Sequence, residues 1–377
     1  MRSVVFVNRY FHPDHSATSQ IASDLAFHLA SRGWDVTAVT SRQRYDDPRA
    51  RLESDVTHGV YVRRVWSTRF GRAGLAGRAV DYLTFYLSAF FELLRHRRSV
   101  VIAMTDPPLT SVIAAIAALL TSGRFVNWVQ DLFPEVAESL GIKAPRVLRR
   151  LRDWSLRRAR ANVVLGDLMG ARVPKAIIIH NFADADLAPQ PRPANESFVV
   201  GYSGNLGRAH EFETIMGAMR QLPEVRFLFT GAGAQLEAVK RAAGPNAFFR
   251  PYAPREELSA SLSAADAHLV SLKPTLEGLV LPSKFYGVLA VGRPVIFVGS
   301  RDGELARIID AHRCGVVVEM GDVDGLTNAI RTLAHDRAGA AAMGQRGREL
   351  YLTRFAPHHA FAQWERLLER VHEEAPS

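Results

Sequence analysis

The sequence predicts an α/β protein made of two doubly wound halves. Short runs rich in β-branched residues alternate with helix-length segments in both halves, which is the pattern of repeated β-α-β units. A proline-rich segment between the halves carries no apolar periodicity. In the second half, glycine turns follow two successive strands, as is typical where ligands bind at the carboxyl ends of a parallel sheet. Together these observations favour two Rossmann-like domains facing a cleft.

In the first half, an amphipathic helix carries Ile21, Leu25 and Leu29 at helical spacing, and Gly33 follows it where a C-terminal glycine is expected. Residues 82–94 form a second, strongly apolar helix. The strands have little polar alternation, as expected in a sheet covered on both faces. They are expected at Val4–Val7, Val36–Thr40, Val60–Val65, Val100–Ala103, Phe125–Val129, Val163–Leu165 and Ala176–Ile179.

After the proline-rich stretch the same pattern starts again, and a last helix is expected over Pro357–Glu373. We therefore expect an N-terminal domain over 1–185, a linker over 186–197, a C-terminal domain over 198–355, and a final helix within 356–377 that packs back on the N-terminal domain. Strands of the second half are expected at Phe198–Tyr202, Arg226–Thr230, Ala267–Ser271, Pro294–Val298 and Gly315–Val318, with helices at Glu211–Gln221 and Ala234–Ala243.

Length and composition fit a two-domain globular protein. The chain has 377 residues, of which 47% are hydrophobic and 23% charged. Cys314 is the single cysteine, so no disulfide framework is possible and a cytoplasmic location is expected. The longest apolar run, Val112–Leu120, falls well short of the roughly 20 residues that span a bilayer.

The net charge of +9 is concentrated in the first half. Residues 1–195 contain 27 Lys and Arg against 17 Asp and Glu, whereas residues 196–377 contain 20 against 21. A positive field on one half indicates an anionic partner, such as a lipid surface or a phosphorylated acceptor. The alternative is that the arginines only keep the protein soluble.

Two glycine turns and one longer motif point to a phosphate-bearing ligand. Gly204-Asn205-Leu206-Gly207-Arg208 follows a strand and is expected to precede a helix, and Gly231-Ala232-Gly233 follows the next strand. Such turns let the backbone approach a phosphate, although a single one can be purely structural. The run Glu277-Gly278-Leu279-Val280-Leu281-Pro282-Ser283-Lys284 is harder to explain by packing alone.

Over essentially the whole chain, the sequence resembles the family 4 retaining glycosyltransferases of the GT-B fold. The resemblance is carried by GNLG and TGAG after successive strands, by AADAHLVSL, and by EGLVLPSKFYGVLAVGRPVIF. In the first half it is carried by YFHPDHSATSQIASDLAFHLASRGWDVTAVTS and WVQDLFPE. It looks closest to bacterial polysaccharide and lipid-linked oligosaccharide transferases.

The resemblance implies a role for each matching residue. Glu277 would bind hydroxyls of the donor sugar, and the amides near Leu279 and Val280, with Pro282 and Ser283 beside them, would reach the sugar or diphosphate. Asp131 would lie near the acceptor hydroxyl. The remaining donor-binding residues would border the diphosphate; they are Ser16, Ala17 and Thr18 in the first half and Gly204, Asn205, Leu206, Gly207, Arg208, Gly231 and Gly233 in the second.

In this family the departing phosphate is thought to take the acceptor proton itself, which gives retention without a protein nucleophile. Cationic groups and N–H donors then stabilise the leaving diphosphate, with Lys284 and Arg208 in the place of a metal ion. We expect no metal and no other cofactor, since no His/Cys cluster with the spacing of metal ligands is present.

The sequence departs from the family pattern at several positions. Relatives usually have Arg and Lys where Asn205 and His210 stand, and His where Gln130 stands. The second Glu of the family's Glu-x7-Glu element, which normally holds the ribose, falls on Phe285 or Gly287. Structural alternatives also stay open, because Asp131 can cap a turn, Glu277 can be a solvated loop carboxylate, and Lys284 can lie on an exposed helix start.

A basic segment supplies a candidate membrane contact. Arg146–Arg160 holds seven arginines with apolar residues between them, including Leu148, Leu151 and Trp154. A basic amphipathic helix with a tryptophan suits an anionic lipid interface on the inner face of the cell membrane. A core-packed helix with a solvated basic face is the alternative.

The sequence therefore favours transfer of a sugar from a nucleoside-diphosphate sugar, with UDP expected, to a glycan or polyprenyl-diphosphate-linked acceptor. Alternatives are a sugar-nucleotide epimerase of the same fold and a non-catalytic sugar-nucleotide-binding scaffold. A nucleic-acid-binding protein is disfavoured, because the basic clusters lack a recognition motif or a stacking platform.

Overall fold

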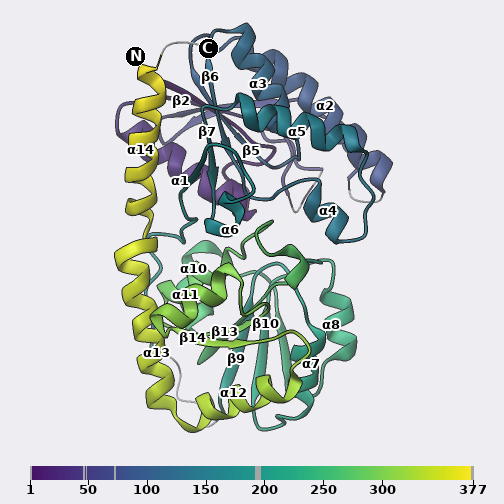
Figure 1. Cartoon of the computed structure of the whole chain (residues 1–377), viewed down its shortest axis with the longest axis vertical. Helices are drawn as coiled ribbons and strands as arrows, with labels where there is room; N and C mark the ends of the chain where they lie inside the picture. Colours follow the sequence, from purple (N-terminus) through teal and green to yellow (C-terminus); the bar gives the residue numbers. More distant parts are fainter. Residues whose placement is uncertain (1, 46, 48, 72–73, 192–196, 375–377) are drawn as a thin grey trace. The chain divides into compact units, whose positions relative to one another are not determined.

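A computed structural model describes residues 2–45, 47, 49–71, 74–191 and 197–374. The chain divides into two compact units (Figure 1). Unit 1 consists of Met1–His180 together with Phe361–Ser377, and unit 2 consists of Asn181–Ala360. The first division thus falls a few residues before the expected position, and the end of the chain belongs to the same unit as its start.

Unit 1 is built on one sheet with the strand order β3-β4-β2-β1-β5-β6-β7-β8, in which only the edge pair β3–β4 is antiparallel. The strands are β1 (Ser3–Val7), β2 (Asp35–Ser41), β3 (Asp55–Thr57), β4 (Val60–Val65), β5 (Val100–Met104), β6 (Arg124–Trp128), β7 (Ala161–Val164) and β8 (Ala176–Ile178). The helices are α1 (Ala17–Ser31), α2 (Leu75–Leu93), α3 (Thr110–Leu120), α4 (Glu135–Ser139), α5 (Arg146–Arg158) and α6 (Asp167–Gly170), with α14 (Pro357–Glu373) at the end of the chain.

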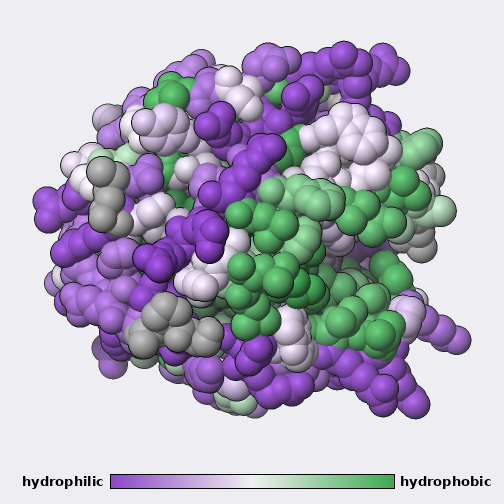
Figure 2. All heavy atoms as spheres, turned by 90° about the horizontal axis from the view of Figure 1, so that it is seen from above, coloured by the Kyte–Doolittle hydropathy of each residue, from purple (hydrophilic) through white to green (hydrophobic). Residues whose placement is uncertain are grey.

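One face of this sheet is covered by α2 and α3, whose Phe85, Ala89 and Ala114 pack against Val5 and Val101. The sequence accounts for this packing, since Phe85, Ala89 and Leu93 recur every four residues along α2. Hydrophobic residues also gather on the outside of the molecule, in the view of Figure 2. Within the described residues, no helix combines the length and the apolar character needed to cross a bilayer.

Unit 2 is built on a parallel sheet with the order β11-β10-β9-β12-β13-β14. The strands are β9 (Val199–Ser203), β10 (Arg226–Thr230), β11 (Ala247–Arg250), β12 (Ala267–Ser271), β13 (Val295–Val298) and β14 (Gly315–Val318). The helices are α7 (Glu213–Arg220), α8 (Leu236–Ala242), α9 (Leu258–Ser263), α10 (Lys284–Ala290), α11 (Glu304–His312), α12 (Val323–His335) and α13 (Arg337–Leu350).

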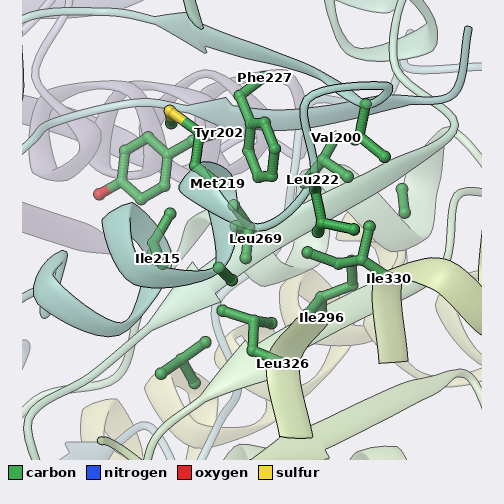
Figure 3. Close-up of a cluster of buried hydrophobic side chains, with 14 of the residues drawn as sticks. Val200, Tyr202, Ile215, Met219, Leu222, Phe227, Leu269, Ile296, Leu326 and Ile330 are labelled. Atoms are coloured by element: carbon green, nitrogen blue, oxygen red, sulfur yellow. The ribbon is translucent and has the colours of Figure 1, made fainter. Parts of the chain in front are cut away.

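The core of unit 2 lies between this sheet and helices α7 and α12. Figure 3 shows Ile215 and Met219 of α7 meeting Leu326 and Ile330 of α12 over the strand residue Leu269. Such close packing fixes where each strand ends, and the loops at these ends build the candidate site.

The expected linker is partly bound to unit 2. The amides of Ala188 and Gln190 donate hydrogen bonds to the hydroxyls of Ser259 and Ser263 at 3.2 and 3.0 Å. Residues 192–196 of the linker lie outside the described residues.

Candidate functional site

In unit 2, the candidate site lies where β9, β10 and β12 end. These three strands are parallel neighbours, so the loops that follow them meet at one edge of the sheet. The loop after β9 contains Gly204–Arg208, the loop after β10 contains Gly231–Gly233, and the loop after β12 leads to Glu277 and Lys284. The topology therefore brings the three sequence motifs of the second half together.

The two glycine turns interlock. Gly204 donates its amide to Thr230 O at 2.9 Å, and Leu206 donates to Ala232 O at 2.8 Å. A Cβ on Gly231, where φ is +135°, would lie 2.1 Å from Gly204 O, and one on Gly233 would lie 2.6 Å from the backbone N and O of Leu206. Both glycines are thus required by close backbone contact between the loops, whatever ligand they border.

The loop after β9 differs from the expected phosphate-binding turn at a helix start. The next helix, α7, begins only at Glu213, so Gly204–Arg208 is not its N-terminus. The amides of Gly204 and Leu206 are already used within the protein. Arg208 is exposed, as is Asn205, so the guanidinium is open to an anion from solvent.

Lys284, the first residue of α10, is held at the centre of this edge. Its ammonium donates to the hydroxyl of Tyr202, lies 3.2 Å from His210 Nε2, and lies 3.5 Å from the carbonyl oxygen of Asn205. It also sits 3.9 Å from the centre of the Tyr202 ring, within range of a cation–π contact. The ammonium is therefore close to Asn205 and His210, the two positions where the family has its basic residues.

The electrostatics of this Lys284 cluster favour an anion. Burial lowers the pKa of Lys284 well below its usual range. Burial, and then the Lys284 charge, lower the pKa of His210 to about 3. Neutral His210 donates Nδ1–H to Ser271 O at 2.5 Å and accepts from Lys284 through Nε2. No acidic side chain among the described residues forms an ion pair with Lys284, so a bound phosphate would supply the missing counter-charge.

Glu277 caps the start of α11. Its Oε2 accepts from the Glu304 amide at 3.3 Å, while its buried Oε1 has no hydrogen-bond partner among the described residues. A Cβ on Gly303 would lie 2.4 Å from Oε1, so the missing side chain at Gly303 makes room for the carboxyl group. Desolvation, with a smaller contribution from the Glu304 carboxylate, raises the pKa of Glu277 to about 7 against the effect of the Glu304 amide. Its free oxygen can bind a hydroxyl.

The segment between Glu277 and Lys284 is a tight turn. Leu279 and Val280 both donate their amides to Leu276 O, at 3.0 and 3.3 Å, so neither amide is free for a ligand in this conformation. Pro282 is buried and Ser283 partly buried, directly before α10.

The structure supplies no carboxylate at the two positions proposed for the second Glu. Phe285 is fully buried in the core, and Gly287 packs against Leu262. Glu304, which the motifs did not single out, is the buried carboxylate beside Glu277. Only the fold could reveal it, because Glu304 lies in a separate βα unit.

In unit 1, the loop after β1 ends at the start of α1. Asp14 is buried there and accepts from the Ser16 amide at 2.8 Å and from the Tyr45 amide at 2.5 Å. Ser16 precedes α1, and its buried hydroxyl has no hydrogen-bond partner among the described residues. Ala17 and Thr18 are the first two residues of α1, so their amides point out of the helix start, where an anion is favoured.

Asp131 follows β6 and has an exposed side chain. Desolvation by the surrounding protein, and then the Asp106 carboxylate, raise the pKa of Asp131 to about 6. Solvent screens part of this effect, because the group keeps exposed surface. Gln130, beside it, is buried, and its backbone amide donates a hydrogen bond to Thr105 Oγ1 at 3.3 Å.

Sequence reasoning missed a buried ion pair near these loops. Arg9 lies 3.7 Å from Asp81, and both side chains are almost fully buried. Arg9 also donates to Gln43 Oε1 at 2.9 Å, and its backbone amide donates to Asp106 O at 2.7 Å. The Arg9 backbone thus holds the loop that carries Asp106, while the Arg9 side chain pairs with Asp81. An arginine two residues after a buried strand is the signal that the sequence offers for this ion pair.

Metal ligands do not cluster in the part of the chain that the structure describes: it contains no group of three or more His, Cys, Asp or Glu placed to hold an ion. Cys314 is buried, and burial raises its pKa to about 11, so it is an unreactive thiol.

Comparisons with known proteins agree with this architecture. Residues 17–181 match the family of glycosyl transferase 4-like domains, and residues 197–336 match the glycosyl transferases group 1. A protein described as probable glycosyltransferase WbjE of Pseudomonas aeruginosa is 29% identical over 267 residues, which are 63% of this chain and 67% of that protein.

Two further matches cover nearly the whole chain. The putative colanic acid biosynthesis glycosyl transferase WcaI of Escherichia coli (strain K12) is 23% identical over 366 residues, which are 85% of this chain and 89% of that protein. The structure of Anabaena HepE in complex with UDP and glucose has a TM-score of 0.73 at 15% identity and covers 98% of this chain and 100% of that one. Since the two family matches cover most of both units, the chain is a glycosyltransferase of the group 1 family with the GT-B fold.

Proposed function

We propose that this glycosyltransferase moves a sugar from a UDP-sugar, with retention of configuration, to a glycan or polyprenyl-diphosphate-linked acceptor in bacterial surface polysaccharide synthesis. The observation that carries the proposal is the Lys284 ammonium, which has no acidic partner among the described residues and lies beside the loop that follows β9. A nucleoside diphosphate would provide the negative charge that this site lacks. The UDP bound in HepE and the colanic acid named for WcaI support the choice of base and of pathway class.

The residues of the two units suit separate parts of the reaction. As the bond between the anomeric carbon and the phosphate oxygen breaks, Lys284 would stabilise the charge on the leaving diphosphate. The free oxygen of Glu277 would bind a hydroxyl of the donor sugar. The oxygen of the acceptor hydroxyl forms the new bond to the anomeric carbon, and the hydroxyl proton passes to the departing diphosphate. Asp131 would position the acceptor hydroxyl, and no metal ion would be needed.

The proposal is tested first by ligand binding. Isothermal titration calorimetry with UDP, GDP and ADP should show the tightest binding for UDP, and Lys284→Ala should weaken it. Lys240→Ala is a matched control, because Lys240 is surface-placed and pairs with Glu237 at 3.0 Å. If none of the three nucleotides binds, the proposal is contradicted.

Transfer is then measured with UDP-sugars and a detergent-solubilised polyprenyl-diphosphate-linked acceptor. We expect a product with the donor's anomeric configuration by NMR and unchanged activity with EDTA. Asp131→Asn should lower kcat/KM for transfer by roughly 100-fold, the scale of a lost polar group at the reaction centre. Asp153→Asn serves as the control. An inverted product would overturn the retaining mechanism.

We further propose that the enzyme works on the cytoplasmic face of the cell membrane and touches anionic lipid through Arg146–Arg160. The structure supports this for some arginines of the segment and not for others. Arg149 and Arg152 are engaged by Glu135 and Glu138, at distances of 2.5–3.2 Å, and Arg160 lies 3.4 Å from Glu374.

A further inference from the structure

We propose that unit 1 docks on an anionic lipid bilayer through an apolar patch on the outer faces of α2 and α3, bordered by free arginines. The proposal deepens the membrane contact stated above, because it assigns the apolar part of that contact to α2 and α3 and keeps only some of the α5 arginines. Docking itself needs neither donor nor acceptor, so it can be tested apart from catalysis.

The outer face of α2 is apolar along its length. Val80, Leu83, Leu87 and Phe91 are 41–65% exposed and follow one another at spacings of three and four residues, so they form one stripe. The opposite side of the helix already contributes Phe85 to the core. Between Arg78 and Glu92 the one charged residue is Asp81, which is buried. A surface helix normally presents polar residues on this side, so the stripe indicates a second apolar environment.

Helix α3 extends the patch. It packs beside α2, contains no charged residue, and exposes Ile116, Leu119 and Leu120, the last by 65%. Figure 2 shows hydrophobic side chains gathered into a continuous area edged by hydrophilic ones. Contiguous exposed apolar surface of this kind marks an interaction site, whereas scattered single residues do not.

Arginines border the patch on two sides. Helix α5 is joined to α3 by a 2.8 Å hydrogen bond between Ser111 Oγ and Ser155 Oγ. On α5, exposed Val147 and Leu151 share a face with Arg150 and Arg158.

Four of the five exposed arginines of α5 form no ion pair with a described residue; they are Arg146, Arg150, Arg157 and Arg158. At the end of α3, the Arg98 amide donates to Thr121 O at 3.2 Å, which places exposed Arg97 and Arg98 beside Leu120.

This combination favours a lipid surface over a second copy of the chain. An anionic bilayer offers an apolar interior for the stripes and negative headgroups for the arginines at the same interface. A second copy would instead bring an equal excess of positive charge, since the first half of the chain carries 27 basic against 17 acidic residues. Hence we commit to anionic lipid as the occupant.

The test is sedimentation of the full chain with vesicles of phosphatidylcholine, with and without 30% phosphatidylglycerol, in the absence of donor and acceptor. We expect binding to the anionic vesicles only, decreasing between about 0.1 and 0.5 M salt. The double substitution Leu83→Ser with Leu87→Ser should lower the partition coefficient at least tenfold, and Arg157→Gln with Arg158→Gln roughly tenfold. All these side chains are exposed, so thermal unfolding should be unchanged.

Matched controls lie in unit 2, where Leu352→Ser changes a leucine that is 48% exposed and Arg241→Gln changes an exposed arginine. Both should bind vesicles as the wild type does. If the leucine pair variant also binds as the wild type does, the patch is not the docking surface.

The proposal would be overturned if the wild type bound no vesicles and formed a dimer in analytical ultracentrifugation that a patch variant converted to a monomer. That result would assign the patch to a second copy of the chain. Transfer to the detergent-solubilised acceptor separates the two proposals. A patch variant that transfers normally but has lost the vesicles supports docking. A wild type that binds vesicles but never transfers contradicts only the proposed function.

Discussion

Lys284 is placed where its charge destabilises the free protein and where, in the proposed function, a phosphate of the ligand would bind. The side chain is partly buried among Tyr202, His210 and the Asn205 carbonyl, and burial lowers its pKa well below the usual range. Desolvation of an unbalanced cation opposes folding, and an incoming phosphate would reverse this penalty. Polar groups held in this way are typical of functional sites.

Replacing Lys284 by methionine should therefore have opposite effects on stability and binding. Lys284→Met keeps the volume and removes the buried charge, so the melting temperature of the free protein should rise. UDP affinity should fall about 10- to 100-fold, the scale of a lost charge-assisted hydrogen bond. Thermal unfolding with and without UDP measures both effects. A variant that loses stability and keeps affinity would show that Lys284 is structural.

Glu277 predicts a pH dependence of stability. Its pKa of about 7 in the folded protein lies above the ordinary 4.5, so the folded state holds the proton more tightly than the unfolded chain does. The wild-type free energy of unfolding should then decrease as the pH rises from about 4.5 to about 7, and level off above.

Glu277→Gln removes the titrating group and should abolish this part of the slope. At pH 8 the variant should be more stable than the wild type, by at most about 3 kcal/mol, while transfer falls because the carboxyl no longer binds the donor sugar. Urea unfolding at pH 5 and pH 8 measures the change. Glu319→Gln, at an exposed glutamate, is the control, and equal slopes for wild type and Glu277→Gln would refute the assignment.

At the scale of elements, the interlocked loops after β9 and β10 set the shape of the candidate site. Gly231 must be glycine for two reasons, a φ of +135° and the closeness of Gly204 O. Gly321 has a comparable φ of +91°, but no atom lies within 4 Å of the place where its Cβ would be. A side chain at Gly321 would therefore meet backbone strain alone, whereas a side chain at Gly231 would meet both backbone strain and a steric clash.

Gly321→Ala should cost about 1–2 kcal/mol of unfolding free energy and leave UDP binding unchanged. Gly231→Ala should cost more, because the Gly204 loop must move, and should weaken UDP binding at least tenfold. Urea unfolding and calorimetry measure the two quantities. Equal stability losses with unaltered UDP affinity in both variants would show that the interlock does not shape the site.

Helix α5 shows that helical spacing alone does not determine which face of a helix packs against the protein. By helical spacing, Leu148, Leu151 and Ser155 fall on one face of α5, but the structure buries Ser155 and leaves Leu151 exposed. Helical periodicity gives the angle between residues around the helix axis, but it does not determine which side of the helix packs against the rest of the unit. The Ser111–Ser155 hydrogen bond to α3 settles the rotation of the helix.

At the scale of the whole molecule, the chain returns to its starting unit. Trp364 of α14 is fully buried in unit 1, with its ring 4.7 Å from that of Trp128 at the end of β6. Arg2 lies 2.6 Å from Glu369, further along α14, and Arg124 donates to the carbonyl oxygen of Glu374, just after the helix. Unit 1 is therefore complete only once α14 has been synthesised.

Trp364→Ala should destabilise the protein by roughly 3–5 kcal/mol, because it leaves a large cavity beside Trp128. The loss should appear in the transition of unit 1 when thermal unfolding is followed by circular dichroism. Trp66→Ala, at a tryptophan that is 58% exposed, should change stability by less than about 1 kcal/mol. A small effect at Trp364 would mean that the tail contributes little to unit 1.

The sequence by itself determined the alternation of strands and helices, the two parallel sheets and the positions of the glycine turns, because these follow from local periodicity and from backbone demands at single residues. The family motifs placed Glu277 and Lys284 in one short segment. The tertiary structure alone decided that Lys284 lies against Asn205 and His210, that the Leu279 and Val280 amides are already bonded, and that the apolar side of α2 faces outward. Each of these three features depends on the order of the strands in the sheet and on the rotation of each helix about its own axis. These depend on contacts between segments that are distant in the sequence, and such contacts produce no local sequence pattern.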